Sequence, residues 1–198
     1  MAARSVDSAD RRLSRVHQLP RQATRPQPPV RHSLRPRLTA IAPSTAEAVQ
    51  SAGGWLFDQV MAGWDVTVVT ADQADPRPLH ILGVRARDLD SLFSTTAVLG
   101  PCLQAVAVRS ELYDADERVR RLVLTAAESG NTDIRLWGDL WPSDFEGAAD
   151  SVSHRLSLAA RAFKAQALAV ADLAEESSAD TEVFRRGEIR RPGLVSAR

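Results

Sequence analysis

Short apolar runs rich in β-branched residues alternate along residues 38–180 with longer segments of helical periodicity. Val, Ile and Thr favour the pleated, half-buried surface of a sheet, so the short runs predict β-strands. The predicted strands cover residues 38–42, 66–70, 79–84, 103–108 and 134–137. Strands that alternate with helices indicate parallel crossover connections and an α/β fold.

Three predicted helices begin at a capping box, in which a side-chain acceptor stands three residues before a glutamate. The pairs are Ser44 and Glu47, Asp114 and Glu117, and Ser143 and Glu146. Helices are expected over residues 45–62 and 115–129, and from residue 144 to beyond 172 as one long amphipathic helix. The Gly53-Gly54 pair in the first helix predicts a break or close packing there.

Residues 71–78 form a short link with two aspartates and two prolines, which predicts a hairpin loop between antiparallel strands at 66–70 and 79–84. The other strands are joined through helices. The sequence therefore predicts a single α/β domain with a mixed, mostly parallel sheet of about five strands covered by helices. A long C-terminal amphipathic helix and disordered basic tails complete this prediction.

The formal net charge is zero, with 25 basic and 25 acidic residues, but the charges are unevenly placed. Residues 1–40 hold nine arginines and two aspartates, and residues 181–198 hold five arginines and two glutamates. Such segments have too few large apolar residues to offset their ordering entropy. We therefore expect disordered tails at residues 1–37 and 181–198, around an α/β domain at residues 38–180.

Several kinds of chemistry are missing from the chain. Cys102 is the only cysteine, so no intrachain disulfide or multi-cysteine metal site can form. There is no glycine-rich phosphate loop, and none of the four histidines has a metal-ligand partner at helical spacing, so we expect no cofactor and no metal. The absence of a signal segment and of a membrane span predicts a cytoplasmic location. The dominance of arginine over a single lysine is typical of GC-rich bacterial coding.

Polar residues at the ends of the predicted strands form a candidate ligand site. The carboxyl ends of parallel strands gather at one edge, where open α/β sheets bind ligands. This edge is expected to carry Asp72, Arg85, Arg109, Trp137 and Asp139. The alternative is that these charges only solvate the strand ends, and no residue is singled out as catalytic.

Two motifs have alternative interpretations. Asp88-Leu89-Asp90 has the spacing of a metal-chelating pair and equally that of a helix start. Trp137 and Trp141 flank a Gly-Asp turn, where the indoles would wall a ligand site, contact a partner or pack in the core. Trp141 is our candidate for a partner contact.

Because recognisable catalytic motifs are absent, the leading hypothesis is a non-catalytic regulatory or protein-interaction module with an unknown protein partner. The alternative is an enzyme or sensor that binds a small polar or nucleotide-like ligand at the carboxyl-terminal strand edge. A third hypothesis is a nucleic-acid accessory protein that makes weak contacts through its basic N-terminal arm. A homodimer is left open, and no membrane partner is expected.

Overall fold

The computed structural model describes residues 35–72, 75–94, 103–146, 150–173 and 179–188. Most of the predicted tail at residues 1–37 and the end of the chain therefore lie outside the described residues. The strands of the described part are β1 (Arg37–Ala42), β2 (Asp65–Thr70), β3 (Arg85–Asp88), β4 (Leu103–Arg109), β5 (Asp133–Trp137), β6 (Asp150–Arg155) and β7 (Thr181–Arg186).

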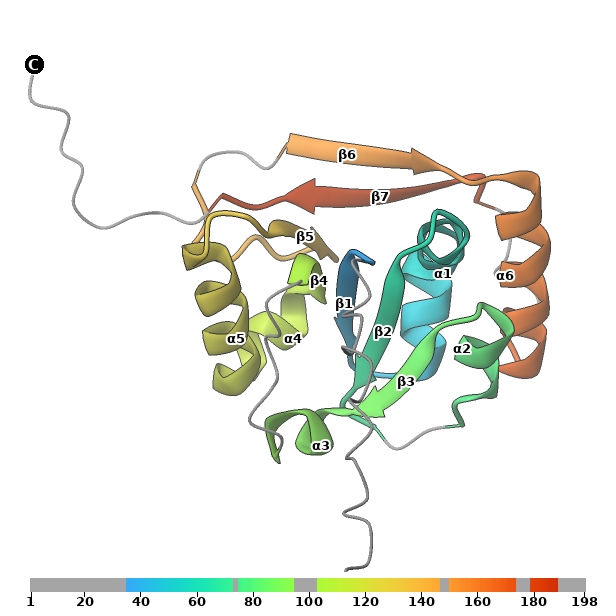
Figure 1. Ribbon diagram of the computed structural model, residues 1–198, viewed down its shortest axis with the longest axis horizontal. Coiled ribbons are helices and arrows are strands. Elements are labelled where there is room, and N and C mark those ends of the chain that lie inside the picture. Colours follow the sequence, from blue (N-terminus) through green and yellow to red (C-terminus); the bar gives the residue numbers. More distant parts are fainter. Residues whose placement is uncertain (1–34, 73–74, 95–102, 147–149, 174–178, 189–198) are drawn as a thin grey trace, which may run out of the picture. The chain divides into compact units, whose positions relative to one another are not determined.

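These strands form one sheet with the order β3-β2-β1-β4-β5-β7-β6 (Figure 1). Five neighbouring strands run parallel, in the order β3, β2, β1, β4 and β5. Strand β7 is antiparallel to both of its neighbours, β5 and β6. The predicted α/β domain is confirmed. The described sheet has seven strands, so it is larger and more mixed than the predicted sheet of about five.

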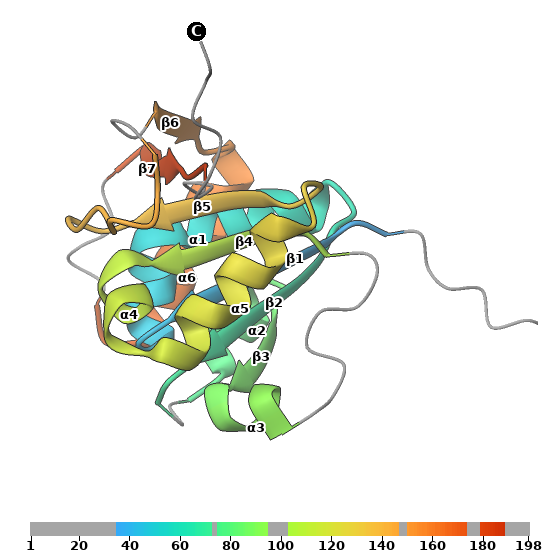
Figure 2. The same cartoon turned by 90° about the vertical axis from the view of Figure 1, so that its left-hand side faces the viewer.

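Helices cover both faces of the sheet (Figure 2). They are α1 (Thr45–Met61), α2 (Arg77–Ile81), α3 (Leu89–Ser94), α4 (Ser110–Ala115), α5 (Glu117–Glu128) and α6 (Leu158–Val170). The central strand β1 sends Leu38 and Ala40 into a core shared with α1, α2 and α6, and Ile41 into a second core beneath α3, α4 and α5. Within the described residues, no helix is long and apolar enough to span a membrane.

Residues 77–81 form helix α2, which corrects the predicted strand at 79–84 and the hairpin before it. Leu79 and Leu82 are both buried, and their three-residue spacing suits a helix as well as a strand. Gly83, with a φ of 72°, follows the helix and turns the chain. The link between β2 and β3 is consequently a helical crossover, and these two strands are parallel.

The predicted helix from residue 144 to beyond 172 is replaced by strand β6 and the shorter helix α6. Ser157 starts α6, because its side chain accepts a hydrogen bond from the N–H of Ala160 at 3.0 Å. The four-residue step from Val152 to Leu156 imitates a helical stripe, although β6 alternates between exposed and half-buried residues.

Strand β7 occupies residues that the sequence analysis assigned to the start of a disordered tail. Its pattern is inverted, because Glu182 is buried whereas Val183 is 54% exposed. Phe184 is fully buried and packs against Trp55, with ring centroids 4.7 Å apart. A strand that buries a charge gives no hydrophobic alternation for a sequence analysis to detect.

Glu182 is buried among partners from α1 and α6. Its Oε1 accepts a hydrogen bond from the N–H of Gly54 at 3.0 Å, and its Oε2 accepts one from Trp55 at 2.7 Å. The Lys164 Nζ lies 2.6 Å from Oε1 and also donates to the carbonyl oxygen of Gln50 at 2.7 Å. Because a buried charge is tolerated only when it is paired and hydrogen-bonded, this network fixes β7 and α6 on the middle of α1.

The predicted close packing at Gly53-Gly54 is present in the structure. A Cβ atom at Gly54 would lie 2.5 Å from the methyl groups of Leu156, which leaves room only for glycine. The segment that leads into α6 therefore lies directly against α1.

We expect Glu182→Gln to lower the free energy of unfolding by about 3–5 kcal/mol, because it leaves the Lys164 ammonium buried without a counter-ion. The double variant Glu182→Gln/Lys164→Met removes both charges and should recover part of this loss. Urea denaturation of the two variants and the wild type measures the difference. A double variant that is less stable than the single one would contradict this account.

Asp58 makes a second link between α1 and the segment before α6. Its carboxylate lies 2.9 Å from Nε2 of His154 and accepts hydrogen bonds from the Ser157 hydroxyl at 2.7 Å and the Ser157 N–H at 3.2 Å. Burial raises the pKa of Asp58, but the hydrogen bonds from Ser157 and His154 outweigh burial and hold this pKa below its ordinary value of 3.8.

Acid should weaken this second link. The pKa of Asp58 is lower in the folded than in the unfolded protein, so its stabilising effect is present above pH 3.8 and is lost as the pH falls through the lowered value. In Asp58→Asn we expect lower stability at neutral pH and a shallower loss of stability in acid, measured as urea midpoints across this range. Asp150→Asn, at an exposed position, is the control and should keep the wild-type profile. Equal acid dependence in wild type and Asp58→Asn would refute the assignment.

Candidate functional site

The strand order reverses direction at β1, because β2 and β3 lie on one side of it and β4 and β5 on the other (Figure 1). Ligands of open α/β sheets bind at such a point, outside the carboxyl ends of the strands. Helix α1 begins there, immediately after β1, and Ser44 caps it by accepting a hydrogen bond from the N–H of Glu47 at 3.1 Å. The first turn of α1 and the ends of β1, β4 and β5 therefore form the candidate site.

Glu47 is the centre of a hydrogen-bonded cluster at this edge. Its Oε1 accepts hydrogen bonds from the Ser51 hydroxyl at 2.9 Å, the Trp137 indole N–H at 2.8 Å and Nη1 of Arg109 at 2.9 Å. Its Oε2 is buried and has no hydrogen-bond partner among the described residues. One carboxylate oxygen thus joins α1 to the ends of β4 and β5.

Arg109 lies between two carboxylates, because its Nε also donates to Oε2 of Glu111. Burial lowers the pKa of Arg109, but the negative charges of Glu47 and Glu111 outweigh burial and raise it overall. Burial raises the pKa of Glu111, whereas hydrogen bonds from its own N–H, from the Asp139 N–H at 3.0 Å and from Arg109 outweigh burial and lower it. The guanidinium and the Glu111 carboxylate are therefore both held in their charged forms.

Gly138 packs directly against the side chains of Ser110 and Glu111. Its φ of 111° is in the region that favours glycine, and a Cβ atom there would lie 2.4 Å from Oε2 of Glu111 and 2.5 Å from Oγ of Ser110. The Ser110 hydroxyl is fully buried and lies 3.0 Å from the carbonyl oxygen of Trp137. The turn after β5 is consequently held against the start of α4.

A cleft of ≈ 350 Å³ lies at the same edge of the sheet. Its walls come from α1, from the ends of β2 and β3 and from the segment before α2, and the lining residues are Thr45, Thr70, Asp72, Pro76, Ala86, Arg87 and Asp88. The volume falls in the range of small-molecule sites, roughly 300–1,000 Å³.

Asp72 connects the loop after β2 to the turn after β1. Its N–H donates to the carbonyl oxygen of Pro43 at 3.2 Å, and its own carbonyl oxygen accepts the Thr70 hydroxyl at 2.8 Å. The carboxylate oxygen Oδ1 is buried without a hydrogen-bond partner among the described residues. A desolvated acceptor of this kind costs about 1–3 kcal/mol, so it favours a ligand or water that supplies a donor.

The structure places four of the five predicted site residues at the carboxyl edge. Asp72 lines the cleft, Arg109 and Trp137 belong to the Glu47 cluster, and Asp139 contributes its backbone N–H. Arg85 is not at this edge, because it begins β3 and pairs with Asp65 at the start of β2. Its misplacement follows from the wrong strand at residues 79–84, which put Arg85 at a strand end rather than at a strand start.

The structure also describes the Asp88–Asp90 motif and Trp141. Asp88 accepts a hydrogen bond from the N–H of Ser91 at 2.7 Å and starts α3, which favours the helix-start interpretation of the Asp88–Asp90 motif. Trp141 is half-buried and packs on Phe145, with ring centroids 5.5 Å apart. Its role as a partner contact stays a prediction.

The sequence analysis identified Glu47 only as a capping residue and did not single out Glu111. Glu47 lies in the first turn of the helix that follows β1, and that position alone signalled its closeness to the strand edge. Glu111 comes two residues after the end of β4, so the same argument that identified Arg109 applied to it.

No protein-family model matches the sequence, and no curated protein shows significant sequence similarity to it. Solved structures share the fold. A triple mutant of the deacetylase of the teicoplanin biosynthetic pathway is 17% identical with a TM-score of 0.57, and the match covers 79% of this chain and 100% of that one. The A40926 pseudoaglycone deacetylase is 18% identical with a TM-score of 0.56, and the match covers 79% of this chain and 99% of that one. The zinc-inhibited form of the teicoplanin deacetylase is 15% identical with a TM-score of 0.58, and the match covers 79% of this chain and 100% of that one.

These structural neighbours are deacetylases, so this chain has a fold that enzymes use. The leading hypothesis from the sequence, a non-catalytic regulatory or protein-interaction module, is therefore wrong. The alternative hypothesis, an enzyme or sensor with a ligand site at the strand edge, agrees better with the neighbours. At 15–18% identity the likeness shows the fold alone, and the site residues have to carry any functional argument.

Proposed function

We propose that this protein is an enzyme or sensor that binds a small, hydroxyl-rich polar ligand in the cleft at the carboxyl edge of the sheet. The observation that carries the proposal is the Asp72 carboxylate, which lines the cleft and has a buried oxygen with no hydrogen-bond donor among the described residues. The shared fold supports the proposal, because the structural neighbours are deacetylases of the teicoplanin biosynthetic pathway and of the A40926 pseudoaglycone.

The chemistry of the cleft wall favours a neutral or basic ligand with several hydroxyl or amine donors. Asp72 and Asp88 can only accept hydrogen bonds when ionised, and Thr45 and Thr70 offer hydroxyls that donate or accept. The two carboxylates outnumber the single guanidinium of Arg87, which disfavours a phosphate-rich ligand. The apolar part of the wall is only a proline and an alanine, so a ligand is held mainly through its polar groups. Sugars, amino sugars and nucleosides match this wall.

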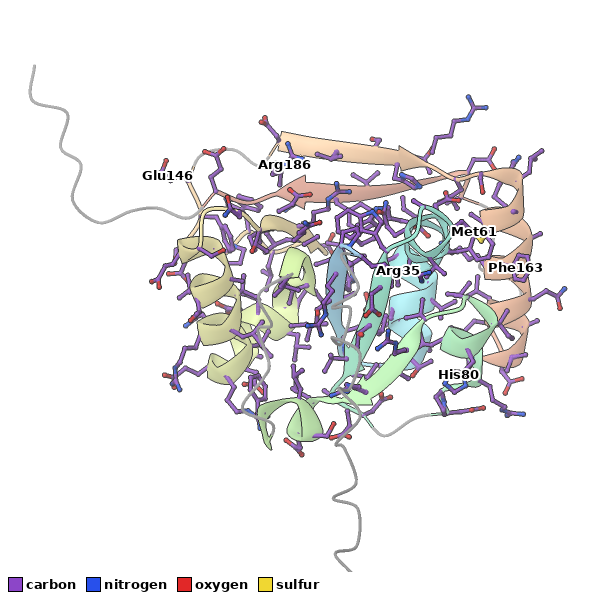
Figure 3. All side chains as sticks on the ribbon, viewed as in Figure 1. Arg35, Met61, His80, Glu146, Phe163 and Arg186 are labelled. Carbon is purple, nitrogen blue, oxygen red and sulfur yellow. The ribbon has the colours of Figure 1, made fainter. Side chains whose placement is uncertain are left out.

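The zinc of the zinc-inhibited neighbour raises the question of a metal in this chain, and the residues do not fit one. Among the described residues, no three His, Cys, Asp or Glu side chains are grouped so that they could hold a metal ion. His80 is exposed on α2 (Figure 3), and His154 pairs with Asp58 near the C-terminal end of α1. The proposal therefore routes no step through a metal.

A thermal-shift screen of the full chain against sugars, amino sugars and nucleosides tests this function. A ligand at 100 times its dissociation constant adds about 2.7 kcal/mol, which raises Tm by roughly 5–11 °C in a protein of this size. Asp72→Asn should weaken binding of such a ligand about 10- to 100-fold, because it removes a hydrogen bond to a charged group.

Asp75→Asn is the matched control, because Asp75 is a nearby exposed aspartate that does not line the cleft, and it should bind like the wild type. A flat screen across the three ligand classes, or equal affinity of Asp72→Asn and the wild type, would contradict the proposal. Mass spectrometry of the ligand after incubation separates the two modes, since an enzyme converts its ligand and a sensor returns it unchanged.

A further inference from the structure

The Glu47 cluster contains the arrangement that usually surrounds a cation. Glu47 from α1 and Glu111 from α4 converge on one point at the carboxyl edge, and both carboxylates contact the same positive group. Carboxylates that converge from separate elements are typical ligands of divalent cations. Here the positive group is the guanidinium of Arg109, which comes from the end of β4.

We infer that Arg109 is the resident cation of this edge and occupies the place between Glu47 and Glu111 that a divalent metal ion would otherwise take. This inference goes beyond the proposed function, because it concerns the Glu47 cluster, which is separate from the lining of the cleft.

The hydrogen bonds of the cluster occupy three of the four carboxylate oxygens of Glu47 and Glu111, and only Oε2 of Glu47 has no partner among the described residues, whereas a divalent cation needs several oxygen ligands. Oε1 of Glu47 accepts three hydrogen bonds, from Ser51, Trp137 and Arg109. The indole of Trp137 is 3% exposed and donates only, so it can neither move aside easily nor act as a ligand itself. A guanidinium likewise stays protonated and cannot coordinate a metal ion.

The geometry around Arg109 fixes the guanidinium in place. It bonds to both carboxylates, and a Cβ atom at Gly138 would lie only 3.0 Å from its Nε. Its side chain is nevertheless 26% exposed, and Nη2 is not used in its bonds to Glu47 and Glu111. A guanidinium N–H that is left over can donate to a carbonyl or carboxylate oxygen of a ligand, which is the electrostatic role that a metal ion has in other sites.

Calorimetric titration of the full chain with ZnCl₂, without a histidine tag, tests the inference on the wild type and on Glu47→Gln. We expect both proteins to give the same titration, since any zinc they take up binds away from Glu47. Zinc binding at about one ion per chain that disappears in Glu47→Gln would overturn the inference. Neither result depends on the stability of an Arg109 variant.

A second experiment removes the guanidinium of Arg109 by substitution. In Arg109→Ala the two carboxylates lose their counter-charge, and we expect MgCl₂ or ZnCl₂ to raise Tm by at least about 2 °C, as a weakly bound ion does in a domain of this size. The wild type, Arg109→Lys and the surface control Arg161→Ala should show a smaller rise, because any ion that they take up binds away from Glu47 and Glu111. An equal metal response in all four proteins would show that Arg109 does not stand in for a cation.

The two proposals fail in different ways. If zinc binds through Glu47 while the hydroxyl-rich ligand still depends on Asp72, the metal-free inference fails alone. If no ligand binds in the cleft and the zinc titration is unaffected by Glu47→Gln, the proposed function fails and Arg109 remains the resident cation.

Discussion

The buried ion pair between Lys164 and Glu182 is the contact on which the rest of the architecture depends. Its carboxylate accepts hydrogen bonds from two N–H groups in the middle of α1, and its ammonium group donates to a carbonyl oxygen of the same helix. Strand β7 and helix α6 are thereby tied to α1 through groups that cannot be buried singly. Because α1 carries Glu47 in its first turn, the same network helps to set the position of the candidate site about two turns away along α1.

The sequence predicted four of the five parallel strands because local signals and tertiary packing agree there. Strands β1, β2, β4 and β5 are β-branched runs, and α1 has both a capping serine and a glycine pair that its neighbour requires. The antiparallel edge escaped prediction for a physical reason. Strand β7 buries Glu182 and exposes Val183, so its stability comes from a charge partner 18 residues earlier rather than from hydrophobic alternation.

The same distinction separates the site residues that the sequence identified from those that it missed. Arg109 and Trp137 end strands of clear pattern, so the rule that parallel strands meet at one edge located them. Arg85 was misplaced because Leu79 and Leu82 suit either a strand or a helix, and an error in one element moved its end to the opposite edge of the sheet. The contact of Glu47 with Arg109 spans 62 residues, and no local pattern encodes such a pairing.

The fold and the site residues of this chain support different kinds of statement. The deacetylase neighbours establish that this sheet and its helices can support an enzyme, but a fold does not fix a reaction. What this chain places at the strand edge is an acidic, hydroxyl-lined cleft and, separately, a guanidinium held by two carboxylates. The cleft wall offers mainly hydrogen-bond acceptors and the guanidinium offers donors, so the two parts of this edge have complementary polar chemistry.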